Sequence, residues 1–222
     1  MSTLILSDFS KTFTDGDMPT TYSVFAKSGL LGSEYTAARN ALFDERYHFE
    51  TEGNAAETQR WFYDHVELFV QFGLTQALID QIVADDTYFK PRAGIAAFLA
   101  HIRENHITLR IITSGVSNFA EAFFRVRGFG LEGIDIQGNR LIMENGRAVG
   151  VDRSSGINTI DKSDHAFSLS GYDRIIVLGD NYEDCTVAHG VNVRSFGFTD
   201  EDRGFDVKLG KNGSFEDLLK QI

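Results

Sequence analysis

The stretch LILSDFSKTFT, residues 4–14, is an apolar segment that runs directly into an aspartate, Asp8. A second apolar segment, IIVLGD at residues 175–180, ends in the same way on Asp180, and Asp184 follows it. Parallel strands bring their carboxyl ends to one edge of a sheet, where the ligands of such sheets bind. Carboxylates gathered at that edge suit a hard divalent cation. The two segments therefore predict a parallel sheet with a Mg²⁺ site.

The rest of the chain alternates in the way that a doubly wound α/β (Rossmann-like) core requires. Apolar, partly β-branched segments predict buried parallel strands at 3–7, 107–113, 174–178 and 191–196. Amphipathic segments predict helices at 92–104, 117–127, 163–169, 182–189 and 214–221, the first beginning just after Pro91. Short strands around Asn145-Gly146, within 133–151, predict a hairpin.

Residues 16–89 interrupt this alternation. They read as helices at about 34–47, 55–72 and 75–84. We expect them to form a helical cap, with the core made by residues 1–15 and 90–222. An insertion directly after the first strand would lie over the carboxyl ends of the strands, where it would exclude water and choose the substrate.

Composition excludes several classes of protein. Hydrophobic residues make up 42% of the 222 residues, which is typical of a globular fold. The net charge of −11 argues against nucleic acid polymers as partners, and no apolar stretch is long enough to span a membrane. The single cysteine, Cys185, rules out an internal disulfide. We expect a cytoplasmic monomer or weak dimer that binds a small phosphorylated metabolite.

The chemistry of such a site would centre on Asp8. A phosphate monoester repels an anionic nucleophile, so a cation must neutralise the phosphate before Asp8 can attack it. Asp8, Asp180 and the backbone carbonyl of Ser10 are the candidate Mg²⁺ ligands, and Asp184 would orient either Lys162 or a metal-bound water.

Two further residues are candidates for phosphate contacts. Ser114, with Gly115 after it, follows a predicted strand, so its hydroxyl and the adjacent amides could bind phosphate at a helix N-terminus. Lys162 would offset the charge of Asp8 and of the phosphoryl group. Taken singly, each of these residues also fits a cap, a turn or a solvated surface position.

The order of these motifs resembles that of the haloacid dehalogenase superfamily, and the whole chain resembles the cytosolic pyrimidine 5′-nucleotidases. The similar segments are Ser7-Asp8-Phe9 with Thr12-Phe13-Thr14, Tyr47-His48-Phe49-Glu50, Ser114-Gly115, Asp161-Lys162 and Gly179-Asp180-Asn181. The resemblance implies a Mg²⁺-dependent hydrolase of nucleoside 5′-monophosphates that forms an aspartyl-phosphate on Asp8.

In the cap, the resemblance implies that Trp61 stacks on the base and that Glu50 contacts it. His65 matches the family's histidine on the same helix, and Asp64 stands where the family has a serine in the pocket. A plain packing stripe is the alternative, because Trp61 and His65 fall at helical spacing with Leu68 and Phe72.

Ser10 departs from the family pattern, which has an aspartate acting as acid and base at that position. A serine cannot exchange protons usefully near neutral pH, and such help is worth about 10²–10⁴-fold. Asp15, Asp17 or His48 could substitute. A slow phosphatase, a phosphotransferase with a long-lived aspartyl-phosphate and a noncatalytic nucleotide or phosphate binder all remain open. A phosphatase of another small phosphomonoester, such as a phosphorylated amino acid, is the alternative enzyme.

Overall fold

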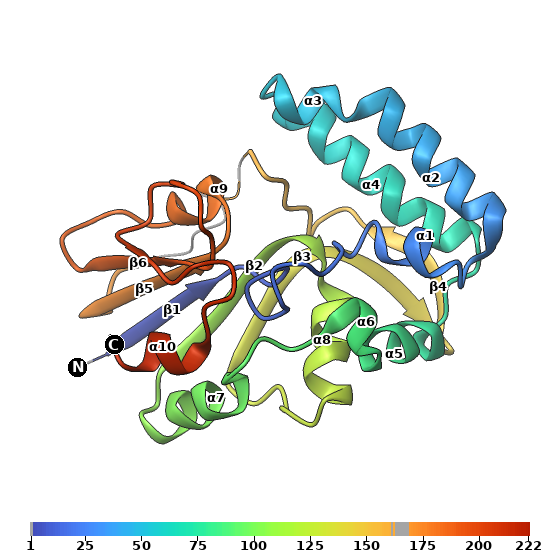
Figure 1. Ribbon diagram of the computed structural model, residues 1–222. Helices are drawn as coiled ribbons and strands as arrows, with labels where there is room; N and C mark the ends of the chain where they lie inside the picture. The colour runs from blue at the N-terminus through green and yellow to red at the C-terminus, as the bar shows by residue number, and fades with distance from the viewer. Residues whose placement is uncertain (1, 161, 163–168) are drawn as a thin grey trace.

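The computed structural model describes residues 2–160, 162 and 169–222. Within them, a seven-stranded sheet has the order β4-β3-β2-β1-β5-β6-β7 (Figure 1). The central strand β1 pairs in parallel with both β2 and β5, and among these strands only the β3–β4 pairing is antiparallel. The predicted doubly wound α/β core is therefore confirmed. The strands are β1 Thr3–Ser7, β2 Thr108–Val116, β3 Ile134–Glu144, β4 Arg147–Asp152, β5 Arg174–Gly179, β6 Val193–Gly197 and β7 Val207–Lys208.

Both faces of the sheet are covered, as parallel strands require. On one face, α7 (Ile95–Glu104), α8 (Ser117–Val126) and α10 (Phe215–Leu219) enclose a core rich in phenylalanine. The other face carries a smaller apolar cluster that includes Leu4, Leu6 and Val177, next to the short helix α9 (Tyr182–Cys185). Successive side chains of β1 point to opposite faces of the sheet, Ile5 into the first cluster and Leu4 and Leu6 into the second. Because both faces are buried, the apolar run of β1 is uninterrupted.

Several boundaries differ from the sequence-based expectations. The helix expected at 92–104 begins only at Ile95, because Gly94 adopts a left-handed φ of 82° and Pro91 forms an isolated bridge with Thr14. The helix expected at 182–189 ends at Cys185. The one expected at 163–169 falls almost wholly outside the described residues. Strand β7 was not predicted, since two edge residues leave no apolar pattern.

The hairpin prediction is confirmed. β3 and β4 pair on either side of Asn145 and Gly146, whose φ values of 49° and 75° are those of a tight primed turn. Asn and Gly adopt this left-handed conformation at the lowest cost, which is why the dipeptide marks the turn in the sequence.

Residues 24–71 form four helices: α1 Val24–Ser28, α2 Gly32–Arg46, α3 His48–Thr51 and α4 Ala55–Gln71. Helices α2 and α4 lie side by side, joined by the stacked rings of Tyr35 and Phe69, and stand beyond the end of β1 (Figure 1). Helices α5 (Gln76–Ala84) and α6 (Asp86–Phe89) follow, and α5 packs on α8 of the core. The division at residues 15 and 89 remains a prediction.

Candidate active site

Asp8 and Asp180 occupy equivalent places at the ends of neighbouring strands. Asp8 follows β1, where its amide donates to Leu178 O at 2.9 Å, and Asp180 follows β5. Asp8 is only 7% exposed, and this burial raises the pKa of its carboxyl to about 6, although Lys162 opposes the rise. Burial, together with the charges of Asp184 and Asp8, raises the pKa of Asp180 to about 8. Without a cation, the carboxylates therefore resist full ionisation.

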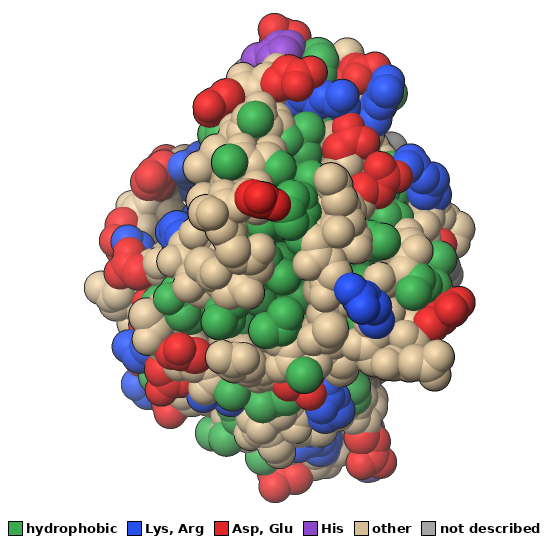
Figure 2. Space-filling model, turned by 90° about the vertical axis from the view of Figure 1, so that its right-hand side faces the viewer, with side chains coloured by type: hydrophobic (Ala, Val, Ile, Leu, Met, Phe, Trp, Pro, Cys, Tyr) green, Lys and Arg blue, Asp and Glu red, His purple; other side chains and the backbone are tan. Residues whose placement is uncertain are grey.

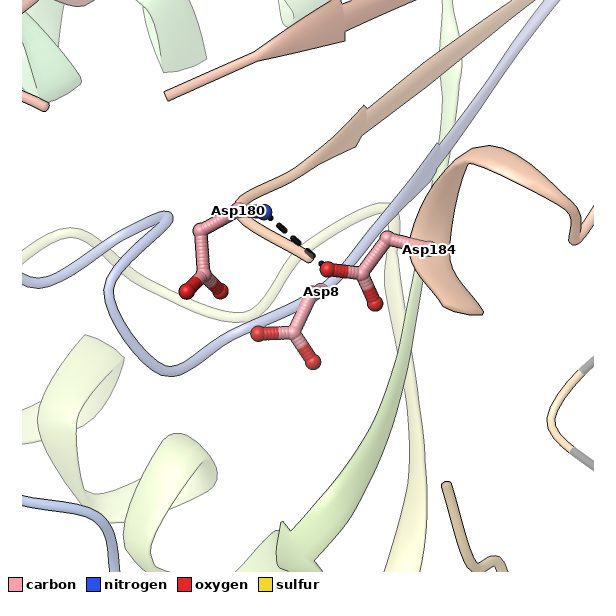
Figure 3. Close-up of side chains that lie close together, drawn as sticks. All are labelled: Asp8, Asp180 and Asp184. Carbon is pink, nitrogen blue, oxygen red and sulfur yellow. Dashed lines mark hydrogen bonds between the residues drawn. The ribbon is translucent and has the colours of Figure 1, made fainter. Parts of the chain in front are cut away.

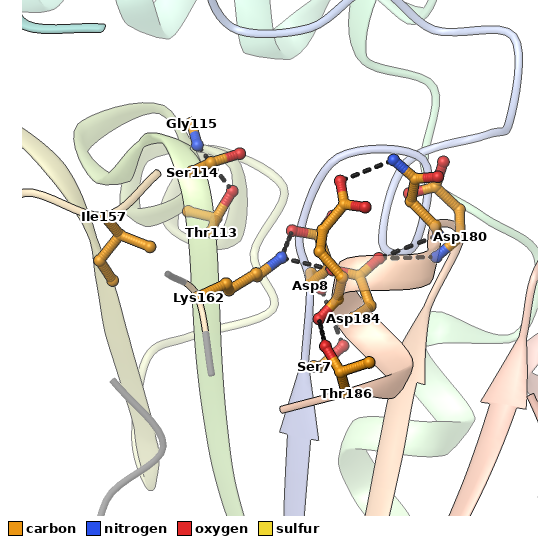
Figure 4. A network of polar contacts seen from close by, with 12 residues as sticks. Ser7, Asp8, Thr113, Ser114, Gly115, Ile157, Lys162, Asp180, Asp184 and Thr186 are labelled. Carbon is orange, nitrogen blue, oxygen red and sulfur yellow. Dashed lines mark hydrogen bonds and ion pairs between the residues drawn. The ribbon is translucent and has the colours of Figure 1, made fainter. Parts of the chain in front are cut away.

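Lys162 joins Asp8 to Asp184. Its Nζ lies 2.7 Å from Asp8 Oδ1 and also donates to Asp184 Oδ1 (Figure 4). Lys162 is 3% exposed; burial opposes its charge, but Asp184 and Asp8 raise its pKa above the ordinary value. Asp184 is fixed in turn by the amides of Asp180 and Asn181, at 3.0 and 3.1 Å. This arrangement lets Asp184 orient the ammonium beside Asp8.

The three aspartates form a cluster with the composition of a cation site. Oxygens of Asp8, Asp180 and Asp184 lie within 4.8 Å of one another, with Asp8 and Asp180 meeting from separate strand ends (Figure 3). The single ammonium of Lys162 contacts two of the three carboxylates. The remaining negative charge and the all-oxygen donor set fit a hard divalent cation such as Mg²⁺.

The loop after Asp8 is held by a buried arginine. Arg92 donates from Nε to Thr12 O at 2.7 Å and from Nη2 to Lys11 O. Lys11 adopts a left-handed φ of 58°, and its amide donates to Thr14 Oγ1 at 2.8 Å. Both Ser10 and Lys11 line the cavity described below. Lys11 was not among the site residues predicted from the sequence. The feature that could have indicated it is a positive charge directly after the Ser7-Asp8-Phe9-Ser10 segment.

Ser114 differs from its expected setting. β2 continues to Val116, and α8 begins only at Ser117, so Ser114 is not at a helix N-terminus. The Gly115 amide donates to Thr113 Oγ1 at 3.1 Å and the Val116 amide to Thr21 Oγ1 at 3.0 Å. Both adjacent amides thus already have internal acceptors, so the expectation that they bind phosphate gains no support here and stays a prediction. The Ser114 hydroxyl, which has no partner among the described residues, is the group left for a ligand.

A cavity of about 260 Å³ connects this cluster with the helices above it. Its floor includes Asp8, Ser10, Ser114, Lys162 and Asp180. Its other end is mostly aromatic and is lined by Phe43, Tyr47, Trp61, Phe62 and His65. The structure thus places the acidic cluster and the aromatic residues on one cavity. Arg39 and Phe43, which also line it, were not predicted, because helix α2 gave no motif. Tyr47 belongs to the cap segment Tyr47-His48-Phe49-Glu50 named from the sequence, but it was not chosen there as a site residue.

The predicted cap residues lie at the aromatic end. Trp61 is 4% exposed and stacks on Phe62 at a ring distance of 5.1 Å. His65 Nδ1 lies 3.0 Å from Trp61 O, and burial lowers the pKa of its imidazole to about 4. Glu50 Oε1 accepts from Thr159 Oγ1 at 2.7 Å, which ties α3 to the core segment near Lys162. Trp61 and His65 therefore both pack in the cap and line the cavity.

Asp64 does not line the cavity. Its carboxylate forms an ion pair with Arg46 on the neighbouring helix α2. Asp64 and His65 are consecutive on α4, so their side chains point in directions about 100° apart and only His65 faces the cavity. The geometry therefore gives no support to the expected role of Asp64 in substrate binding, which stays a prediction.

The surface offers no concentration of positive charge on the face shown in Figure 2. Described Lys and Arg side chains are scattered there among acidic ones, and hydrophobic side chains form a strip down the centre. Among the described helices, none has the length and apolar character needed to cross a membrane.

Comparisons with known proteins agree with this geometry. A family model described as pyrimidine 5′-nucleotidase (UMPH-1) matches residues 6–203. The 7-methylguanosine phosphate-specific 5′-nucleotidase of Homo sapiens is 24% identical over 220 residues, covering 89% of this chain and 73% of the relative. The corresponding protein B of Xenopus laevis is 22% identical over 219 residues, with coverage of 89% and 75%.

Solved structures show the same fold. Cytosolic 5′-nucleotidase IIIB bound to cytidine superposes with a TM-score of 0.79 at 21% identity, covering 98% of this chain and 83% of that chain. A phosphoserine phosphatase from T. onnurineus has a TM-score of 0.60 at 15% identity, with coverage of 100% and 96%.

Proposed function

Because this chain belongs to the pyrimidine 5′-nucleotidase (UMPH-1) family, of the haloacid dehalogenase superfamily, we propose that it hydrolyses nucleoside 5′-monophosphates with the help of Mg²⁺. One observation carries the proposal. Asp8 lies at the floor of a cavity, in contact with Lys162 and beside Asp180, while the far end of the same cavity is lined by aromatic rings. A phosphate and a planar base need these two environments.

In this proposal Asp8 is the nucleophile. Its carboxylate attacks phosphorus, the bond to the leaving oxygen breaks, and an aspartyl-phosphate forms that water then hydrolyses. Lys162, positioned by Asp184, offsets the charge of the transferred group, and the Ser114 hydroxyl donates to a phosphate oxygen. Asp8, Asp180 and the carbonyl of Ser10 would hold Mg²⁺. When bound, the ion would neutralise the phosphate and so let an anion approach it.

The aromatic end of the cavity supports a nucleotide over a simple sugar phosphate. Rings there give a base apolar contact area and stacking, worth about 1–3 kcal/mol per base. The family description names pyrimidine nucleotides and the curated relatives name 7-methylguanosine phosphate, so both bases are candidates. The cytoplasmic location and the monomeric or weakly dimeric state remain predictions.

Because Ser10 cannot act as an acid or base near neutral pH, the proposal does not specify the rate of turnover. A slow phosphatase, a phosphotransferase that keeps its aspartyl-phosphate, and a noncatalytic nucleotide binder would share this cavity. The alternative substrate class is a phosphorylated amino acid. The similarity to phosphoserine phosphatase is one of fold alone, and an aromatic cavity end gives no advantage to so small a ligand.

The deciding experiment measures phosphate release with and without Mg²⁺. Nucleoside 5′-monophosphates, a pentose phosphate, phosphoserine and acetyl phosphate are compared, together with an Asp8→Asn control. We expect Mg²⁺-dependent release that is fastest for nucleotides and absent in the control. Faster release from phosphoserine would establish the alternative substrate. Mg²⁺-dependent nucleotide binding without any release would establish the noncatalytic binder.

A further inference from the structure

Three buried polar atoms at the aromatic end of the cavity have no hydrogen-bond partner in the described part of the chain. They are Nε of Arg39, Nε1 of Trp61 and Nε2 of His65, and all three side chains line the cavity. A buried polar group left unpaired costs about 1–3 kcal/mol. Three such atoms around one cavity indicate groups that a ligand satisfies.

The hydrogen-bonding character of each atom is fixed by chemistry. Arg39 Nε and Trp61 Nε1 carry a hydrogen and can only donate. His65 Nδ1 faces the Trp61 carbonyl oxygen at 3.0 Å, and since that oxygen can only accept, the proton sits on Nδ1. His65 Nε2 is then an acceptor in the neutral ring. Arg39, Trp61 and His65 therefore carry two unpaired donors and one unpaired acceptor at this end of the cavity.

Arg39 also brings a positive charge to this end. Its guanidinium packs over the Phe43 ring, 4.8 Å from the centroid, and within the described residues it forms no ion pair. Arg39 and His65 line the same cavity. Burial chiefly, and the charge of Arg39 to a smaller extent, lower the pKa of His65. The only other charged cap residue on the cavity, Glu50, has one carboxylate oxygen engaged by Thr159.

We propose that Arg39 selects the base of the nucleotide, favouring an uncharged base with two hydrogen-bond acceptors and one donor and rejecting a cationic base. The inference rests on the proposed function. Uracil offers two carbonyl oxygens flanking one ring N–H, and cytosine offers a carbonyl oxygen, a ring nitrogen and an amine. The corresponding edge of 7-methylguanine has one acceptor and two donors, and its ring carries a positive charge.

The same geometry explains how one residue changes the preference. With Arg39 present, a cationic base meets a like charge and leaves one donor unpaired. Without Arg39, Glu50 is the sole charged cap residue among those that line the cavity, and it attracts a cation. Removal of Arg39 therefore has opposite effects on the two kinds of base, which a general loss of packing would not produce.

The test measures binding by titration calorimetry with Mg²⁺ present. The ligands are uridine, cytidine and 7-methylguanosine 5′-monophosphates and a pentose phosphate. The proteins are the parent, Arg39→Met, Arg39→Lys and the matched control Arg46→Met, whose arginine lies on the same helix but pairs with Asp64 away from the cavity. Thermal unfolding of each variant checks its fold, and Arg39→Lys keeps the charge if Arg39→Met proves unstable.

We expect the parent to bind the pyrimidine nucleotides more tightly than the 7-methylguanosine nucleotide. Arg39→Met should shift that ratio by about tenfold or more, the size of one hydrogen bond from a charged group. Arg39→Lys should still reject the cationic base but lose part of the pyrimidine affinity. Pentose phosphate binding should be the same in all proteins, and Arg46→Met should behave as the parent does.

An unchanged ratio in Arg39→Met, or a parent that prefers 7-methylguanosine phosphate, overturns the role of Arg39 while the nucleotidase proposal stands. A parent that binds the pentose phosphate as tightly as every nucleotide overturns both, because the base then contributes nothing. The two failures are thus distinguished by the pentose phosphate.

Discussion

Ser10 follows Asp8, the proposed nucleophile, by two residues, at the position where the family resemblance implies an acid–base aspartate. Ser10→Asp should raise hydrolysis of phosphomonoesters by about 10²-fold or more if proton transfer limits turnover. The gain should be largest for alkyl esters, whose leaving alkoxide most needs a proton, and small for acetyl phosphate. Steady-state rates on the two substrates check this. A folded, Mg²⁺-binding Ser10→Asp protein with no faster turnover would favour the noncatalytic binder.

Asp180 should limit the stability of the metal-free protein. Its pKa of about 8 in the fold exceeds the ordinary 3.8, so its ionisation opposes folding increasingly as pH rises between these values. Asp180→Asn should therefore stabilise the metal-free protein above pH 8, and the difference should vanish below pH 4. Thermal unfolding in a chelator measures it.

The same variant should bind Mg²⁺ more weakly, because it loses one charged oxygen ligand. Calorimetric titration of Mg²⁺ into the parent and into Asp180→Asn measures the two affinities. Unchanged Mg²⁺ affinity in Asp180→Asn would exclude Asp180 as a ligand, whatever its effect on stability.

His65 gives a pH dependence of the opposite sign. Its pKa falls from 6.5 to about 4 on folding, so the unfolded chain binds the proton more readily, and the stability present above pH 6.5 is lost as pH falls toward 4. In His65→Gln, the fall in unfolding free energy between pH 6.5 and pH 4 should be smaller by up to about 3 kcal/mol. Denaturant unfolding of both proteins is measured at several pH values. The contributions of the other titrating groups cancel in the difference between the two unfolding free energies. A parent–variant difference that stays constant with pH would contradict the buried neutral imidazole.

At the residue scale, the sequence predicted those groups that follow apolar strands, and the structure brings Asp8, Asp180, Asp184 and Lys162 together. Strand ends carry a strong pattern, so Asp8 and Asp180 could be located, whereas Asp184 and Lys162 were found only through the order of the family's motifs. Arg39 could not, because α2 has no marked apolar face and its cavity side is defined only by packing against α4.

At the scale of elements, the loop between β1 and the cap depends on Arg92. This buried side chain also donates to two carbonyls of the C-terminal segment and stacks on Phe198. Arg92→Met should destabilise the fold by about 2–4 kcal/mol, because buried acceptors lose their donors. The acceptors concerned are the carbonyls of Lys11, Thr12, Lys211 and Gly213.

Denaturant unfolding tests the Arg92 prediction, and Arg125→Met is a suitable control. Arg125 is half exposed and pairs with Asp80 at the surface, so its removal should cost well under about 1 kcal/mol. Equal losses in the two variants would mean that the buried hydrogen bonds of Arg92 have no special weight.

Long periodic elements were predictable and the junctions between them were not. α4 and α8 follow their apolar spacing closely, whereas α7 starts late because of Gly94 and α9 stops after one turn. The end of β2 was also misjudged. Thr21, from far along the chain, accepts from the amide of Val116, and no local pattern reports such a contact.

At the scale of the whole molecule, the α/β class and its mostly parallel sheet follow from the alternation of strands and helices, and the presence of an insertion follows from the interruption of that alternation. The strand order itself comes from the structure alone. How far the insertion forms a separate unit could not be judged from periodicity. The sequence of α5 reads as one more amphipathic helix of the insertion. In the structure, however, its buried face packs against α8 of the core.

The position of β1 bears on how the protein is made. β1 leaves the ribosome well before its neighbours β2 and β5, and Asp8 meets Lys162 across 154 residues of chain. Contacts so distant in sequence form slowly and only once both partners exist. In a nascent chain, Asp8, the proposed nucleophile, therefore has no partners until β5 and the residues before it have been made, and a truncated product that lacks β5 has no assembled acidic cluster.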